Sequence, residues 1–439
     1  MKIYYFIIIS LILSVLFLVL NSPLFKILFS IIWALTTIVV LISGLHYTQK
    51  FKFLQIHLKE IIKSLKVNNT SKNSINSFEA LTMSMAEKIG VGSISGIAIA
   101  IYLGGVGTIF WICLFTIICS INTYVEAYLG IKYQSNSKDV SYGGPSYYIK
   151  KALHNNKLSK LYAFLIIISY SGIFLAVQAN TITKSINYAF NINPIIITII
   201  LILSIVLILY KGIKKVSTVS SILVPFMIIT YLSIGLIIVI FNIEKLPQII
   251  TNIISSAFTL KGGLSALIYP ITIGLQRALF ATESGLGTTA IASSLTKEDP
   301  HKQGLSAILT VYITTFIVCL STAFIILTTN YTDITFSNLN GIELTLYAFN
   351  YHLKDFGTII LTIIIVLFAY TTIISGYFFG EINLKIFSQK PPKRIFKLFV
   401  LIIITLGCLM TPTIIWNLVD LLVAFLTIIN IYSMLKITK

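Results

Sequence analysis

Long apolar runs, each about long enough to cross a membrane, recur along this chain of 439 residues. A spanning helix needs about 20 predominantly apolar residues, because the hydrocarbon core is about 30 Å thick. Twelve segments are predicted to be such helices: 3–20, 28–46, 80–104, 107–130, 161–188, 194–210, 218–241, 265–284, 305–328, 356–379, 398–412 and 415–436. Only 10% of the residues are charged, against about 25% in soluble domains. The chain is therefore predicted to be an all-α polytopic membrane protein.

The net charge of +18 reflects topology rather than a nucleic-acid partner. Basic residues cluster after the second, fourth, sixth and tenth predicted spans, in the loops that begin near Lys50, Lys132, Lys211 and Lys385. These loops fall on one side if the spans alternate, and cytoplasmic loops carry an excess of lysine and arginine. We expect a multi-pass protein of the cell (inner or plasma) membrane with both termini in the cytoplasm.

Residues 1–24 form an N-terminal hydrophobic segment whose Lys2 and apolar run resemble a signal peptide. The sequence Val-Leu-Asn-Ser-Pro that follows offers no small-x-small cleavage site, so a retained anchor is favoured over a cleaved signal. Residues 25–78 are predicted to form a peripheral transmembrane helix and a basic cytoplasmic loop. Residues 79–439 are predicted to form a core of ten helices.

Two predicted spans are interrupted by glycine and polar residues. The third contains Glu87, Lys88 and a glycine-rich stretch from Gly90 to Gly96, and the eighth contains a polar stretch from Gly274 to Gly287. Glycine costs about 1 kcal/mol relative to alanine within a helix. Unwound backbone is tolerated at membrane depth only where protein or a polar cavity satisfies it. The two spans open the two halves of the core, and broken helices at matching positions indicate a transporter binding site.

A structural alternative is that these glycines allow close helix packing, since Gly92 and Gly96 have small-xxx-small spacing. Charged residues beside both breaks weigh against packing alone, because intramembrane charge costs about 2.5–3.5 kcal/mol per group. We expect Arg277 and Glu283 to form structural or gating ion pairs, with each other or with Glu126 or Asp420. The cysteines show no metal or disulfide spacing and are interpreted as packing residues.

Several motifs in this order resemble the alanine/glycine:cation symporter family, also called the sodium:alanine symporter family. The stretch Ala80-Leu81-Thr82 through Gly96 resembles the family's first core helix, and Thr123 to Tyr133 resembles the end of its second. The segments Gly143-Gly144-Pro145-Ser146-Tyr147-Tyr148-Ile149, Val177-Gln178-Ala179-Asn180 and Arg277 to Thr288 follow with family spacing. So does the Trp, Asp and Asn pattern between Trp416 and Asn430.

The resemblance implies a leucine-transporter-like fold, a 5+5 inverted repeat of ten core helices preceded by one or two extra N-terminal helices. The repeats are expected at about 79–242 and 262–436. It also implies sodium-coupled symport of a small neutral amino acid of the alanine or glycine class, by alternating access, with sodium as coupling ion and no organic cofactor. A monomer in the lipid bilayer is expected.

Candidate substrate contacts lie at the first break, where a new helix start offers free N–H groups and a positive dipole end to a carboxylate. Val91 and Gly92 would contribute backbone amides there, and Ser93 a hydroxyl. The resemblance adds Gln178 as a pocket residue. The candidate substrate-binding residues are Gly90, Val91, Gly92, Ser93, Gln178, Gly274 and Gly376.

Sodium requires hard oxygen ligands. The resemblance implies a site made by carbonyls of Ala86, Ile89 and Phe368 and hydroxyls of Thr371 and Thr372. The alternative for both threonines is a bond back to their own helix. A second sodium site is weaker here, because Ser93 stands where the family has asparagine.

Other departures from the family are Val91 in place of threonine, Ala281, Thr282 and Ser284 in the sixth core helix, and Gly376 in place of tryptophan. The last change would remove a large wall from the pocket. A proton-coupled amino-acid transporter of the same fold and a degenerate, non-transporting member therefore remain alternatives.

Two other classes are disfavoured. The five histidines lie in loops or at span ends without a partner motif, so no enzyme is predicted. A channel would need filter rings of carbonyls or charges, and none is evident in the sequence.

Overall fold

The computed structural model describes residues 22–64, 82, 84–86, 88–136, 141–209, 213–259, 263–330, 339, 341–388 and 390–439. The predicted span 3–20, the residue Glu87 and most of the loop that joins the peripheral helix to the core lie outside these residues.

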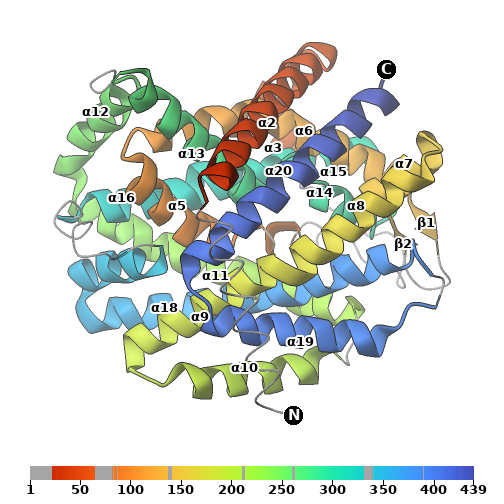
Figure 1. Cartoon of the computed structure of the whole chain (residues 1–439). Helices are drawn as coiled ribbons and strands as arrows, with labels where there is room; N and C mark the ends of the chain where they lie inside the picture. Colours follow the sequence, from red (N-terminus) through yellow and green to blue (C-terminus); the bar gives the residue numbers. More distant parts are fainter. Residues whose placement is uncertain are drawn as a thin grey trace.

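Long apolar helices make up most of the described chain (Figure 1). Eight stretches, some of them several consecutive helices, are long and apolar enough to cross a membrane, and shorter apolar helices accompany them. The peripheral part comprises α2 (Pro23–Lys50), η1 (Leu54–Ile56) and α3 (Leu58–Lys63).

The next part comprises α5 (Val91–Gly104), α6 (Thr108–Lys132), β1 (Ser135–Asn136), β2 (Ser141–Tyr142), α7 (Pro145–Ala152), α8 (Asn156–Ile168), η2 (Ser169–Ile173), α9 (Phe174–Phe190), α10 (Pro194–Leu209), α11 (Ile213–Phe241), η3 (Ile243–Lys245) and α12 (Leu246–Ala257). The last part comprises α13 (Leu264–Thr282), α14 (Thr288–Ser293), α15 (Pro300–Tyr312), η4 (Ile313–Cys319), α16 (Leu320–Leu327), α18 (Ile342–Leu384), α19 (Lys393–Leu409) and α20 (Pro412–Ile437).

The core helices fall into two sets of five that share the same order of features. Each set opens with a broken helix: α5 begins just after a bend at Ile89 and Gly90, and α13 ends just before the turn at Glu283 to Gly287. The first set continues through α6, the α8–η2–α9 rod, α10 and α11. The second continues through the α15–η4–α16 rod, α18, α19 and α20. This order matches the inverted repeat that the sequence predicts.

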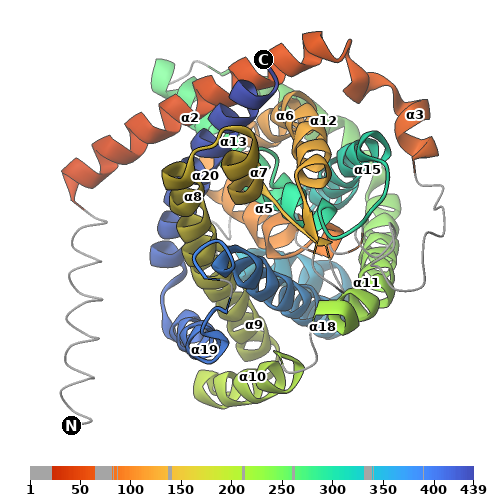
Figure 2. The ribbon, with the colours of Figure 1, turned by 90° about the vertical axis from the view of Figure 1, so that its right-hand side faces the viewer.

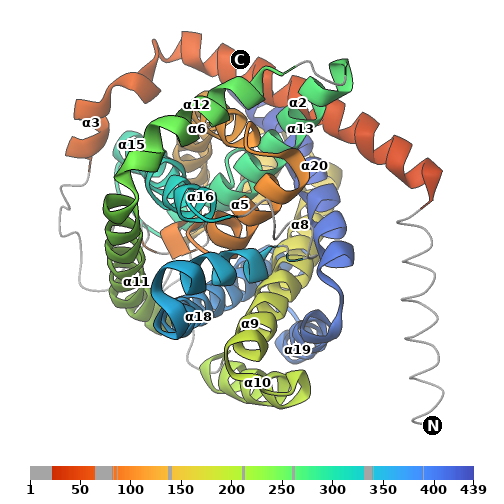
Figure 3. The ribbon, with the colours of Figure 1, turned by 90° about the vertical axis from the view of Figure 1, so that its left-hand side faces the viewer.

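The peripheral helix α2 lies obliquely across one flank of the core (Figures 2 and 3). One of its faces is apolar and exposed, including Leu28, Leu35 and Ile42, as expected for contact with lipid. The opposite face packs on α6 and α20. At its end the Tyr47 hydroxyl lies 3.0 Å from the Thr438 hydroxyl, so this helix is fastened to the C-terminal end of the chain.

Several elements differ from the sequence expectation. The predicted span 356–379 is part of α18, which already begins at Ile342 and is kinked at Lys354, where φ is 52°. The helices α7, α12 and α14 were not predicted. The segments η2 and η4 are short π-helical stretches within continuous rods, and apolar periodicity alone does not reveal such local widening.

The core is closely packed where α6 crosses α14. An added Cβ at Gly130 would lie 2.3 Å from the carbonyl oxygen of Ala290 and 2.8 Å from its Cα, so both backbones block a side chain. At Gly96 the nearest atom to such a Cβ is a Trp416 carbon at 3.8 Å, which is an ordinary contact.

We predict that Gly130→Ala lowers the free energy of unfolding by roughly 1–3 kcal/mol, the usual cost of overpacking. Gly96→Ala is the matched control and should be neutral or slightly stabilising, because alanine is the better helix former. Thermal unfolding of the purified protein in detergent measures both. Equal melting temperatures for the two variants would contradict the close approach of α6 and α14.

Candidate functional site

The first helix break leaves a new helix start inside the core. The Ile89 amide donates to the Met85 carbonyl at 2.7 Å, and Gly90 then leaves helical geometry with φ −154° and ψ −145°. The first N–H groups of α5 lack intrahelical acceptors, and the amide and hydroxyl of Ser93 both donate to the Gly90 carbonyl, at 3.2 and 3.0 Å. Amides of Val91 and Gly92 are thereby left at the positive end of a buried helix.

The second break is a tight turn between α13 and α14. Glu283 adopts a left-handed conformation, and Gly285 and Gly287 have φ values of 89° and 92°. Such angles strain residues that carry a Cβ, which accounts for the two glycines. A Cβ at Gly287 would also meet the ring of Pro145 at 2.2 Å. The turn is therefore held in one conformation by its surroundings.

Side chains from three other helices satisfy the backbone of this turn. Glu126 of α6 accepts the Gly287 amide at 2.8 Å, and Asn430 of α20 donates to the Gly285 carbonyl at 2.9 Å. Asn430 also donates to Glu126 at 2.7 Å, and the Tyr162 hydroxyl donates to the Leu286 carbonyl. Polar backbone at membrane depth needs such partners. We call Glu126 and Asn430 the turn clamp.

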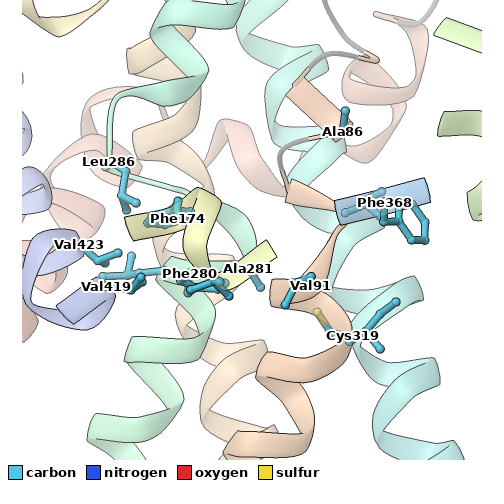
Figure 4. Close-up of a cluster of buried hydrophobic side chains, with 14 of the residues drawn as sticks. Ala86, Val91, Phe174, Phe280, Ala281, Leu286, Cys319, Phe368, Val419 and Val423 are labelled. Atoms are coloured by element: carbon cyan, nitrogen blue, oxygen red, sulfur yellow. The ribbon is translucent and has the colours of Figure 1, made fainter. Parts of the chain in front are cut away.

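The two breaks lie side by side. An added Cβ at Gly92 would lie 2.7 Å from the Phe280 ring and 3.4 Å from the Ala281 Cα. The first turn of α5 therefore contacts the last turn of α13, with Val91, Phe280 and Ala281 in one cluster (Figure 4). The start of α5 and the end of α13 are thus neighbours in the core.

Three of the five candidate sodium oxygens meet at the end of the first half-helix. The Thr372 hydroxyl donates to the Ala86 carbonyl at 2.9 Å, and it also donates to the Phe368 carbonyl of its own helix at 2.9 Å, as the alternative for this residue predicts. Ala86 and Phe368 are neighbours in Figure 4. Thr371 bonds to Phe368 within its own helix at 2.9 Å, as the alternative for this residue predicts. Ile89 follows at the bend and has no hydrogen bond to α18 among the described residues.

Gln178 lies on α9 with 2% of its surface exposed, and its buried Oε1 has no hydrogen-bond partner among the described residues. One and two turns earlier on the same face are Phe174 and Tyr170, whose rings stack at 4.3 Å. Phe174 stacks on Phe280 at 4.8 Å, and Phe280 contacts Trp416 at 4.7 Å. This aromatic column lies beside the two breaks.

Two expected substrate contacts are placed differently. Gly274 lies inside α13, eight residues or about 12 Å before its end, and packs against Trp111, whose Cβ would be 2.6 Å from an added Cβ. Gly376 packs against α9 and η2, where an added Cβ would be 2.8 Å from the Tyr170 carbonyl oxygen and from Leu175. Gly376 therefore does not open a pocket wall, because a neighbouring helix already fills that space.

The structure shows which partners Arg277 and Glu283 have. Arg277 pairs with Asp420, and both are buried, with side-chain exposures of 2% and 8%. The guanidinium also lies over the Trp416 ring at 4.7 Å. Glu283 instead accepts a hydrogen bond from Thr288 at 2.7 Å. A cavity of about 240 Å³ adjoins the Arg277–Asp420 pair, between the end of α5 and the start of α20.

Sequence reasoning missed the aromatic column and the environment of Lys88. The column carried a signal, because Tyr170, Phe174 and Gln178 are spaced by four and so share one helix face. The sequence around Lys88 gave a weaker signal, because no neighbouring residue indicated that its ammonium would lie 3.0 Å from the Thr310 hydroxyl of α15.

Comparisons with known proteins define the class. The fold is similar to a crystal structure of MhsT in complex with L-phenylalanine, with a TM-score of 0.60, 14% sequence identity, and coverage of 84% of this chain and 89% of that one. Together with the paired breaks, this similarity shows that the chain has the leucine-transporter fold.

The sequence profile of the sodium:alanine symporter family matches residues 19–439. The "Probable sodium/glutamine symporter GlnT" of Bacillus subtilis is 34% identical, with 93% of this chain and 87% of that protein covered. The "Sodium/alanine symporter AgcS" of Methanococcus maripaludis is 30% identical, with 93% of each covered. The chain belongs to the sodium:alanine symporter family and is a multi-pass symporter rather than an enzyme.

We predict that Glu126→Leu destabilises the protein by roughly 1–3 kcal/mol, because it removes the acceptor of the Gly287 amide and one of the two acceptors of the Asn430 side-chain amide. Glu126→Gln is the matched control, since its side-chain oxygen can still accept both bonds. Thermal unfolding of the two variants in detergent should separate them by several degrees. A leucine variant as stable as the glutamine variant would contradict the turn clamp.

We predict that Asp420→Ala costs about 3–5 kcal/mol, because it leaves a buried guanidinium unpaired. The double variant Arg277→Met with Asp420→Leu removes both charges and should recover much of that loss. The yield of monodisperse protein and its melting temperature measure the difference. A double variant that is less stable than Asp420→Ala would show that the pair is not mutually compensating.

Proposed function

We propose that this protein is a sodium-coupled symporter of a small neutral amino acid, of the alanine or glycine class, working by alternating access. The observation that carries the proposal is the juxtaposition of the two breaks, with Gly92 against Phe280 and Ala281. An amino acid brings a carboxylate and an ammonium, and both must be satisfied away from water. Free amides at one helix start and carbonyls at the neighbouring helix end supply both kinds of partner.

In this proposal the substrate carboxylate binds the amides of Val91 and Gly92, beside Gly90 and Ser93. The Oε1 of Gln178, which has no hydrogen-bond partner in the described part of the chain, is a suitable acceptor for an ammonium. The aromatic column of Tyr170, Phe174, Phe280 and Trp416 borders the same volume and limits the size of the substrate side chain. Small substrates are also consistent with the alanine symporter among the relatives.

Sodium is proposed to bind between the first half-helix and α18, held by Ala86, Ile89, Phe368, Thr371 and Thr372. Support comes from the approach of the Thr372 hydroxyl to the Ala86 and Phe368 carbonyls, at 2.9 Å each. A cation there would neutralise exposed carbonyls and join the two helices. Substrate and sodium then favour one conformation only through their differential affinity for it.

We further propose that the chain lies in the inner or plasma membrane with both termini in the cytoplasm, acting as a monomer. Loops that carry the expected cytoplasmic lysines contact one another: Lys50 donates to the Thr438 carbonyl, and Lys385 lies 3.9 Å from the centroid of the Tyr142 ring. The cavity beside Arg277 lies toward the opposite end of α20. It would then open toward the outside, with Arg277 and Asp420 at its floor.

Two alternatives are tested directly. Uptake of labelled alanine, glycine and serine into proteoliposomes should require a sodium gradient, and lithium, choline or a pH gradient should not replace it. Uptake driven by a pH gradient without sodium would favour a proton-coupled carrier. Binding without uptake under every gradient would favour a non-transporting member of the family.

We predict that Thr372→Ala raises the sodium concentration for half-maximal uptake roughly tenfold, the effect expected for the loss of one bond to a charged group. Thr362→Ala is the matched control, since that hydroxyl also donates within its own helix, to the Thr358 carbonyl at 2.8 Å, and to another helix, at the Ser185 carbonyl 3.5 Å away, but lies away from the first break. Sodium titrations of uptake compare the two variants. A sodium dependence unchanged by Thr372→Ala would remove this residue from the site.

A further inference from the structure

Lys88 is a buried cation that neither proposed binding site uses. Only 1% of its surface is exposed, although it lies in a predicted membrane span. Its ammonium donates to the Thr310 hydroxyl of α15 at 3.0 Å, and it makes no other hydrogen bond among the described residues. A charge at this depth is costly, and such residues commonly mark a functional pathway.

Two buried carboxyl groups lie within electrostatic reach of the ammonium. They belong to Glu283 at the second break and to Glu126 of the turn clamp, and neither forms a direct ion pair with Lys88 among the described residues. The Oε2 atom of Glu126 is buried and without a hydrogen-bond partner. Among the described residues here, Lys88 is the cation left for these two carboxyl groups, since Arg277 is already paired with Asp420.

Lys88 also lies at the C-terminal end of the first half-helix, one residue before the bend at Ile89. Helix carbonyls there are unpaired and carry the negative end of the dipole, which a nearby cation stabilises. A bound sodium ion would have the same electrostatic effect on such carbonyls. Lys88 supplies this charge through a covalent tether, so it never leaves the site during a transport cycle.

We propose that the Lys88 ammonium is a built-in cation that takes the place of a second mobile coupling ion at the paired breaks. The inference rests on the proposed sodium-coupled function and specifies its stoichiometry: one sodium ion moves with each substrate. Removing the charge of Lys88, with its side-chain volume retained, leaves Glu126 and Glu283 without their cation. A second monovalent cation must then bind for the breaks to hold substrate.

The test is the sodium dependence of alanine uptake by the full-length protein in proteoliposomes, together with the charge moved per substrate on a solid-supported membrane. The wild type should show a Hill coefficient for sodium of about 1 and one net charge per alanine. Lys88→Met should show a Hill coefficient that approaches 2 and a half-maximal sodium concentration raised about tenfold. Lys88→Arg keeps the charge and should behave like the wild type.

Lys245→Met is the matched control, because that ammonium also bonds to a threonine, the Thr328 carbonyl at 2.9 Å, away from the breaks. Its sodium dependence should equal that of the wild type. A Lys88→Met variant that transports with the wild-type Hill coefficient would overturn the proposal. A wild type that itself moves two sodium ions would do so too, even if Lys88→Met fails to fold. Absence of any sodium-driven uptake by the wild type would instead refute the proposed function.

Discussion

Backbone groups that leave a helix inside a membrane must find partners without water, and the core of this protein depends on how that requirement is met. At the second break the partners are permanent: Glu126 and Asn430 bind the Gly287 amide and the Gly285 carbonyl. At the first break the structure is less complete, because the first amides of α5 have no partner in their own helix. A small zwitterion could supply the missing hydrogen-bond acceptor at the start of α5, beside the fixed turn of the second break.

The buried charged residues also fall into two groups, one that forms a direct ion pair and one that does not. Arg277 and Asp420 pair with each other beside the cavity at the start of α20, and this pair joins α13 to α20. Lys88, Glu126 and Glu283 are also buried, and they form no direct ion pair with one another among the described residues. In our proposal, the charge of Lys88 acts on the carboxyl groups and backbone groups of the paired breaks. In the proposed function, ion coupling needs no long pathway, because the proposed substrate and cation sites adjoin each other at the first break.

Much of the architecture followed from periodicity and glycine content. Runs of apolar residues predicted most helices, and Gly90, Gly285 and Gly287 marked the breaks because helices and side-chain-bearing residues both avoid the geometry required there. Prediction from the sequence fails where a residue's contacts come from a distant part of the chain. Gly274 belongs to the same glycine-rich stretch as Gly287, but it serves close packing against Trp111, which lies on another helix.

The same limit applies to side-chain partners. Three carboxylates, those of Glu126, Glu283 and Asp420, were candidate partners of Arg277, and only the crossing of α13 and α20 brings Asp420 to it. Tyr170 and Phe174 could be predicted to share a face with Gln178, but their stacking on Phe280 depends on how α9 meets α13. Local pattern thus predicts where the chain unwinds, and tertiary packing decides what the unwound segments face.

The most direct measurement is an electron cryomicroscopy map of the purified protein with alanine and sodium. The account predicts interrupted helices at residues 89–90 and 283–287, with amino-acid density whose carboxylate contacts the amides of Val91 and Gly92. Continuous helices through both segments, or alanine bound elsewhere while this region is filled by side chains, would contradict it.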